Sequence, residues 1–217
     1  MNCIRIWILV FMFATAQLAG AAAYAGESAD AIQQRIGKGN PAAGKTASYF
    51  CQGCHGEAGI SVEDMIPNLA GQYALYIAKQ LRNFQSGART HQIMSAMSRT
   101  ISDAELDDIA AYFASQKKMQ GNGKGGNPVA RNLFLKGDAG RGIPACMSCH
   151  GENGKGKAPN VPTYPVIGGQ HKAYLSIQLK HWRSGERSNS PDGVMNKVAK
   201  KLTDAEIDAL TDYISGL

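Results

Sequence analysis

The chain has 217 residues, a formal net charge of +6 and 44% hydrophobic residues. This length suits two small domains better than one large domain. One apolar run lies near the N-terminus, and no second stretch approaches the length of a membrane span, which excludes a membrane-spanning domain after that run. We therefore expect a chain that is soluble or only peripherally bound to a membrane.

The first 25 residues have the pattern of a cleaved signal peptide. Arg5 gives a positive start, Ile6–Ala16 is apolar but too short to span a membrane comfortably, and Ala23-Tyr24-Ala25 matches an A-x-A cleavage site. A retained membrane anchor is the alternative. We expect a signal peptide over 1–25, a first domain over 26–118, a linker over 119–127 and a second domain over 128–217.

A helix is predicted to begin at Pro41 and to run into the first of two Cys-x-x-Cys-His motifs. The copies are Cys51-Gln-Gly-Cys54-His55 and Cys146-Met-Ser-Cys149-His150. This pentapeptide is the attachment signature of c-type haem, because its thiols add to the porphyrin vinyl groups and its imidazole ligates the iron. The sequence predicts two covalent c-type haems, attached to Cys51, Cys54, Cys146 and Cys149, with His55 and His150 as axial ligands.

A zinc knuckle or a redox dithiol is the other kind of site that Cys-x-x-Cys forms. The complete motif occurs twice, and no further cysteine or Cys/His pair stands nearby to complete a zinc site. The fifth cysteine, Cys3, falls in the signal peptide, so none is left for a disulfide. Covalent haem and an export signal together point to the bacterial periplasm.

The remaining elements of the first half follow from periodicity and capping signals. Apolar and aromatic residues recur at helical spacing over Gln72–Gln85. Ser102-Asp-Ala-Glu105 is a capping box that opens an amphipathic helix, as Thr203-Asp-Ala-Glu206 does in the second half. Strand-like alternation is absent. We therefore predict an all-α fold of two tandem domains, each a few helices wrapped around one haem.

Gly121–Pro128 has the composition of a linker. It contains G-x-G-x-x-G, but no strand precedes it, so we reject nucleotide binding. Beyond it the sequence repeats, with small insertions after the second haem motif and before the last helix, and this repeat predicts two related domains. The matching segments are Pro67–Gln72 with Pro165–Gln170, Gln80–Arg89 with Gln178–Arg187, and Ile101–Leu106 with Leu202–Ile207.

The sixth iron ligand separates an electron carrier from an enzyme, because a methionine thioether closes the iron whereas an open position admits a substrate. Met94 and Met195 occupy matching positions, seven residues before Ile101 and Leu202. We predict that they are the axial ligands, with Met97 as a fallback in the first domain. Methionines that fill core gaps or lie in loops are the alternative, accepted for Met65, Met119 and Met147. His91, His171 and His181 have no matching histidine and are interpreted as ordinary surface or helix residues.

A ligating imidazole usually donates its second N–H to a carbonyl, which fixes the ring. Pro67 and Pro165 could offer such carbonyls, or could only shape a turn, and Pro162 competes with Pro165. Arg89 and Arg187 match across the repeat and could pair with haem propionates. Solvated surface arginines are the alternative.

These motifs together resemble the dihaem cytochromes c4 over essentially the whole predicted mature chain. The resemblance implies two class I cytochrome c domains packed face to face about a pseudo-two-fold axis, with haem propionates approaching each other. It implies a periplasmic protein, often loosely membrane-associated, that carries electrons from a bc1-type complex to a cbb3-type oxidase or another reductase. Met94 and Met195 match the axial methionines of this family.

The net charge says little about which molecules the protein binds. Ionised haem propionates bring roughly four negative charges and leave the holoprotein near neutral, so nucleic-acid binding is not predicted. Lys155 and Lys157 follow the second haem motif, whereas acidic residues follow the first. This pattern suggests a dipolar molecule whose two ends meet different redox partners, with solvated loop charges as the alternative. The acidic residues are Glu57, Glu63 and Asp64.

We predict an electron carrier, not an enzyme, with no small-molecule substrate. One alternative is the dihaem electron-transfer subunit of a dehydrogenase complex. Another is a dihaem peroxidase or thiosulfate-oxidising enzyme with one open iron, against which the matching methionine pair argues.

Overall fold

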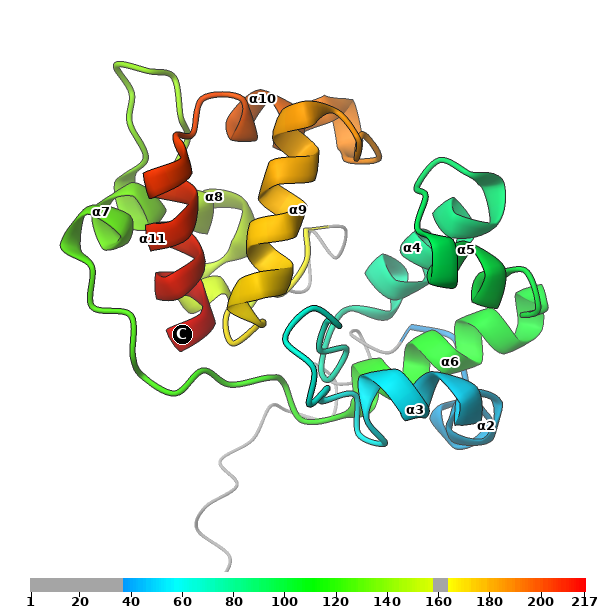
Figure 1. Cartoon of the computed structure of the whole chain (residues 1–217). Helices are drawn as coiled ribbons and strands as arrows, with labels where there is room; N and C mark the ends of the chain where they lie inside the picture. Colours follow the sequence, from blue (N-terminus) through cyan, green and yellow to red (C-terminus); the bar gives the residue numbers. More distant parts are fainter. Residues whose placement is uncertain (1–36, 158–163) are drawn as a thin grey trace, which may run out of the picture.

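The computed structural model describes residues 37–157 and 164–217. Within these ranges the chain forms helices and no strands, apart from one isolated bridge between Asp138 and Ile143. Figure 1 shows two helical bodies joined by an extended segment. The predicted all-α fold with two domains is confirmed. The predicted signal peptide lies outside the described residues, and no described helix is long and apolar enough to cross a membrane.

The first domain is built around α6, against which α2 and α4 pack. Leu106, Ile109 and Phe113 of α6 are almost completely buried, as the predicted amphipathic pattern requires. They form one core with Ile77 and Leu81 of α4. The helices of this domain are α2 (Pro41–Ala47), α3 (Tyr49–His55), α4 (Ala74–Ser86), α5 (Gln92–Ser98) and α6 (Asp103–Ser115).

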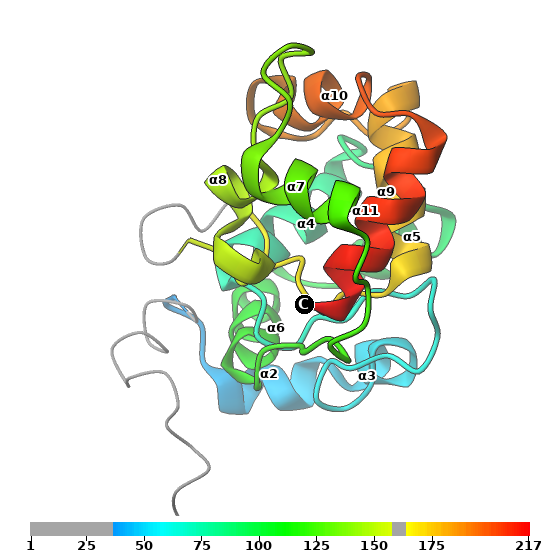
Figure 2. The ribbon, with the colours of Figure 1, turned by 90° about the vertical axis from the view of Figure 1, so that its left-hand side faces the viewer.

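The second domain repeats this arrangement around α11, which contacts α7 and α9. Ile207, Leu210 and Ile214 of α11 are buried against Leu133 of α7 and Leu175 of α9. The elements are α7 (Pro128–Lys136), α8 (Cys146–His150), η1 (Glu152–Gly154), α9 (Lys172–Ser184), η2 (Pro191–Gly193), α10 (Val194–Ala199) and α11 (Asp204–Gly216). In Figure 2, turned by 90°, the second domain faces the viewer and α4 and α5 of the first domain lie behind it.

Both capping boxes are confirmed. Ser102 Oγ accepts a hydrogen bond from the Glu105 amide at 3.4 Å, and the Glu105 carboxylate accepts one from the Ser102 amide at 3.0 Å. Thr203 and Glu206 make the same pair of bonds, at 3.2 and 2.9 Å. Two amide groups that each helix would leave unsatisfied therefore have acceptors.

The predicted continuous helix from Pro41 into the first haem motif is wrong, because α2 and α3 are separate helices that meet at Ser48. The Ser48 hydroxyl donates to the carbonyl of Lys45 at 3.1 Å, and the Gln52 side chain donates to the same carbonyl at 2.8 Å. A continuing helix would use that carbonyl for a backbone hydrogen bond. Side-chain competition of this kind ends helices.

The second domain differs at the corresponding place. Residues 137–145 form a loop between α7 and α8, which the sequence comparison did not identify as an insertion. The loop begins at Gly137, whose φ of 70° lies in the region that favours glycine. A hydrogen-bonded turn between Asp138 and Ile143 then closes it.

The predicted linker is packed against the second domain at its beginning. Met119 is 1% exposed and packs with Tyr73 and Val166, one from each domain. The Gly121 amide donates to the carbonyl oxygen of Leu217 at 2.6 Å. The interpretation of Met119 as a gap-filling residue fits this position. The linker therefore holds the end of α11 as well as joining the domains.

Lys155, one of the two lysines behind the predicted dipole, is hydrogen-bonded within the chain and is not a solvated loop charge. Its ammonium group donates to the carbonyls of Met119, Gly168 and Leu217 at 2.8, 2.9 and 3.1 Å. Burial lowers the pKa of Lys155 to about 8. Two acidic residues after the first haem motif also have partners within the chain: Glu57 pairs with Lys45, and Asp64 lies 3.4 Å from Nδ1 of His171. The dipolar charge distribution stays a prediction.

Candidate haem sites and the domain interface

The first Cys-x-x-Cys-His motif lies on α3, with His55 buried at its last position. The ring atom Nδ1 of His55 lies 2.8 Å from the carbonyl oxygen of Pro67. A carbonyl only accepts, so Nδ1 carries the proton and donates. Nε2 has no hydrogen-bond partner among the residues that the structure describes. The ring is therefore fixed with one nitrogen left over for a metal.

The second motif has the same geometry. His150 ends α8, is buried, and lies with Nδ1 2.9 Å from the carbonyl oxygen of Pro165. Pro165, and not its competitor Pro162, makes this contact, and Pro162 falls outside the described residues. Burial lowers the pKa of both His55 and His150, which favours the neutral imidazole, the form that ligates a metal.

The donor set fits c-type haem better than the other classes of Cys-x-x-Cys site. Burial raises the pKa of Cys51, and raises that of Cys146 to about 11. A redox dithiol needs an attacking thiol of low pKa, so the motif is a poor candidate for one. The described residues also contain no group of three or more His, Cys, Asp or Glu side chains that could hold zinc. Two cysteines and one fixed imidazole per domain are what haem attachment requires.

The candidate sixth ligands lie at corresponding places. Met94 is in the first turn of α5 and packs partly buried against the first core, and Met195 is in the first turn of α10. The Met195 amide donates to Ser190 Oγ at 3.2 Å, and the Met94 amide donates to Nδ1 of His91 at 3.3 Å. His91 therefore caps α5, which accounts for it without a role at the iron.

Arg89 and Arg187 come together at the domain interface. Arg89 donates to Gln80 of its own domain at 2.8 Å and to Gln178 of the other domain at 2.9 Å. Arg187 does the reverse, donating to Gln178 at 2.6 Å and to Gln80 at 3.1 Å. Each guanidinium also lies over an aromatic ring of its own domain, Phe84 for Arg89 and Trp182 for Arg187. The alternative of solvated surface arginines does not describe Arg187, which is 6% exposed.

No carboxylate among the described residues pairs with these two arginines. Although burial opposes it, the two guanidinium groups lower the pKa of the Tyr174 hydroxyl. Burial is the main cause of the lowered pKa of Lys79, and the two guanidinium groups lower it further. Two adjacent cations, Arg187 buried and Arg89 half-buried, without a carboxylate partner create a place that favours an anion. This property fits the propionates of haem groups near the interface.

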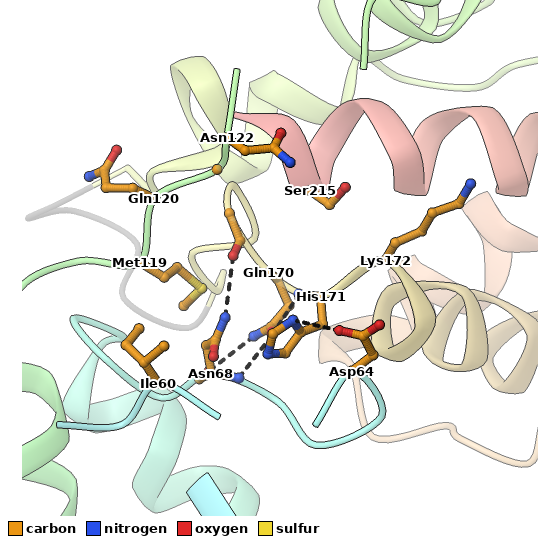
Figure 3. A pocket seen from close by; sticks show the side chains of 12 residues that line it. Ile60, Asp64, Asn68, Met119, Gln120, Asn122, Gln170, His171, Lys172 and Ser215 are labelled. Carbon is orange, nitrogen blue, oxygen red and sulfur yellow. Dashed lines mark hydrogen bonds and ion pairs between the residues drawn. The ribbon is translucent and has the colours of Figure 1, made fainter. Parts of the chain in front are cut away.

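Two glutamines, Gln72 and Gln170, bind the backbone of the opposite domain. Gln170 accepts from the Asn68 amide at 2.9 Å and donates to the Asn68 carbonyl at 2.9 Å, as Figure 3 shows in part. Gln72 accepts from the Val166 amide at 2.9 Å and donates to the Val166 carbonyl at 2.8 Å. The repeat predicts that these two glutamines match, but it predicts no role for them. The signal was their recurrence at the same distance after Pro67 and Pro165.

A cavity of about 360 Å³ lies beside these contacts, between the domains. Asn68 and Asp64 of the first domain and Gln170 and His171 of the second line it, together with the linker residue Asn122 (Figure 3). The Nε2 atom of His171 lies 3.1 Å from the Ser61 carbonyl and Nδ1 lies 3.4 Å from Asp64. His171 therefore belongs to the interface and is not an ordinary surface residue.

Comparison with known proteins agrees with this architecture. The cytochrome c family model matches residues 41–117 and 130–217. Cytochrome c4 of Pseudomonas aeruginosa is 41% identical over 182 residues, covering 82% of this chain and 89% of that protein. A thiosulfate dehydrogenase electron acceptor of Thiomonas intermedia is 35% identical over 182 residues, covering 80% of this chain and 81% of that protein.

Among solved structures, reduced recombinant cytochrome c4 from Pseudomonas stutzeri superposes with a TM-score of 0.75 at 37% identity. The match covers 82% of this chain and 99% of that one. Both domains of the chain thus have counterparts in a solved cytochrome c4. The chain belongs to the cytochrome c family, with two domains like those of the dihaem cytochromes c4, and it is an electron carrier with two covalently bound c-type haems.

Proposed function

We propose that the chain carries single electrons in the bacterial periplasm, from a bc1-type complex to a cbb3-type terminal oxidase or another reductase. One observation supports this most strongly. Each domain holds a buried histidine whose Nδ1 is fixed by a carbonyl, on a helix with two cysteines, and a methionine lies on a later helix of the same domain. When bound, a haem with His and Met axial ligands supplies a one-electron centre of raised potential.

The proposed ligands are His55 with Met94 and His150 with Met195. Cys51, Cys54, Cys146 and Cys149 form the covalent links, and Pro67 and Pro165 orient the histidines. Arg89 and Arg187 neutralise the propionates from the interface. We propose export by a signal peptide over 1–25, and domains over 26–118 and 128–217 joined by a linker over 119–127.

The ligands are tested by the weak far-red absorption band of the ferric protein, which reports methionine sulfur on haem iron. We expect two equivalents of this band in the wild-type chain and one equivalent in Met94→Ala or Met195→Ala. Met97→Ala should keep both equivalents and serves as the matched control for Met94→Ala. One equivalent in Met97→Ala, with two in Met94→Ala, would transfer the ligand role to Met97.

A second candidate is the electron acceptor of a thiosulfate dehydrogenase, which the resemblance to the Thiomonas protein favours. Stopped-flow reduction of the oxidised holoprotein separates the two functions. We expect reduction by quinol plus a bc1-type complex to be faster by at least tenfold than reduction by quinol alone. Faster reduction by thiosulfate plus a thiosulfate dehydrogenase than by the bc1 system would instead identify the second function.

A further inference from the structure

One peptide group in each domain is hydrogen-bonded on both of its sides. The carbonyl of Pro67 lies 2.8 Å from His55 Nδ1, and the amide N–H of the same peptide group, that of Asn68, donates to Gln170 Oε1 at 2.9 Å. The twin group joins Pro165 to Val166. Its carbonyl lies 2.9 Å from His150 Nδ1, and its N–H donates to Gln72 Oε1 at 2.9 Å. In both cases the histidine and the glutamine belong to different domains.

The glutamine side chains are held in place for this contact. Gln170 Oε1 also accepts from the amide of His171 at 3.0 Å, and Gln72 Oε1 accepts from the amide of Tyr73 at 3.1 Å. Both glutamines are 4% exposed, so bulk water does not compete for the bonds. The other end of each side chain donates to a backbone carbonyl, which leaves the oxygen and not the nitrogen facing the peptide N–H.

Hydrogen bonds in such a chain polarise one another. An acceptor on the N–H side of a peptide group makes its carbonyl oxygen more negative and therefore a better acceptor for the imidazole N–H. A stronger bond at Nδ1 raises the basicity of the ligating nitrogen and stabilises the oxidised iron. We propose that Gln170 and Gln72 are positioning residues that lower the reduction potential of the haem in the opposite domain, each acting through one peptide group. The proposal rests on His55 and His150 being the iron ligands.

The coupling is crossed, and this sets it apart from an ordinary effect of nearby residues. Gln72 belongs to the domain of His55 but contacts the peptide group that orients His150. Gln170 belongs to the domain of His150 but contacts the peptide group that orients His55. Each iron then depends on the docking of the other domain, without any contact between the glutamine and the histidine.

The experiment is a pair of variants in the full holoprotein, Gln72→Met and Gln170→Met. Methionine has a similar length and fills the space but offers the peptide N–H no good acceptor. We expect Gln72→Met to raise the potential of the haem bound to His150 and Gln170→Met to raise that of the haem bound to His55. The other haem should shift less in each variant. Spectroelectrochemistry gives the two potentials, and NMR of haem methyl groups assigns them to domains.

Two further variants control for packing. Gln72→Glu and Gln170→Glu keep an oxygen acceptor at the peptide N–H, so the opposite potential should stay at or below the wild-type value. The shorter Gln72→Asn and Gln170→Asn should raise it, and they carry the test if a methionine variant does not fold. In the reduced protein, the Nδ1–H proton resonance of the opposite histidine should move upfield in the methionine and asparagine variants only.

The proposal is overturned if the potentials do not move, if both rise equally, or if each glutamine affects the haem of its own domain. These results differ from a failure of the proposed ligation. If His55 or His150 is not a ligand, the wild-type protein itself lacks a haem-shifted imidazole signal from that residue. Unchanged ligand signals with no crossed shift would reject the glutamine coupling alone.

Discussion

At the scale of single residues, two equivalent carboxylates have different hydrogen-bond partners in the two domains. Glu105 and Glu206 occupy the same position in the two capping boxes. Only Glu206 also accepts hydrogen bonds from Arg141, one of them at 3.1 Å. These bonds are the main reason that the pKa of Glu206 is lowered to about 2. Hydrogen bonds from Ser102 alone lower the pKa of Glu105.

This difference predicts an acid-dependent contribution to stability from Glu206. Its folded-state pKa lies below the ordinary value, so the contribution is present above about pH 4.5 and is lost as the pH falls toward 2. Glu206→Gln keeps a capping oxygen but loses the charge. We expect it to lower the free energy of unfolding by about 1 kcal/mol at pH 7. The deficit should shrink between pH 4.5 and 3 in denaturant titrations.

Glu105→Gln is the matched control, because it changes the same capping position without an arginine partner. Its deficit at pH 7 should be smaller than that of Glu206→Gln. Equal deficits in the two variants, with the same dependence on pH, would show that capping and not Arg141 accounts for the effect.

At the scale of elements, the crossing of α2 over α6 depends on a glycine. Gly44 of α2 is buried, and a Cβ placed on it would fall inside van der Waals contact with the Asp108 carbonyl of α6. Since that atom is backbone, it cannot rotate away. Because Gly44 has no side chain, α2 can approach α6 closely at this point.

Gly44→Ala should therefore destabilise the first domain, although alanine is the better helix former. We expect the free energy of unfolding to fall by about 1–3 kcal/mol through overpacking. Gly126→Ala is the control, because a Cβ there meets nothing within 4 Å and the change should stay within about 0.5 kcal/mol. Guanidinium unfolding followed by circular dichroism measures both. A Gly44→Ala protein as stable as wild type would show that α2 can shift.

The sequence predicted those elements whose signals are local. The haem motifs, the capping boxes and the stripes of α4, α6 and α11 each depend on residues within one or two turns of one another. The separation of α2 from α3 at Ser48 is also local. It depends on side-chain hydrogen bonds to the Lys45 carbonyl, which the spacing of apolar residues does not predict. The repeat does not predict the loop over 137–145, because its matching segments all lie after the haem motifs.

The rest of the site depends on contacts between residues far apart in the chain. The partners of Gln72 and Gln170 could not be predicted, because nothing in one half of the sequence specifies the surface that the other half presents. Arg89 and Arg187 illustrate the limit. Their matching positions predicted a shared role, but only the structure shows that each donates to glutamines of both domains.

At the scale of the whole molecule, polar side chains and backbone groups join the domains more than opposite charges do. The glutamines bind peptide groups, and the two arginines bind amide oxygens. The Asp64 carboxylate lies 3.4 Å from Nδ1 of His171 across this contact, and Asp64 is largely exposed. Screening by salt acts mainly on exposed charges. The relative placement of the domains is therefore expected to be insensitive to ionic strength.

The reciprocal bonds of Gln72 and Gln170 have the form of an isologous contact, in which residue i of one partner meets residue j of the other and the reverse. Two identical subunits can form such a contact, so the interface is of the kind that holds a homodimer. Joining the partners by a short segment makes their association intramolecular and independent of protein concentration. It also frees the two copies to diverge, as Asn68 and Val166 have done at the point where each meets its glutamine.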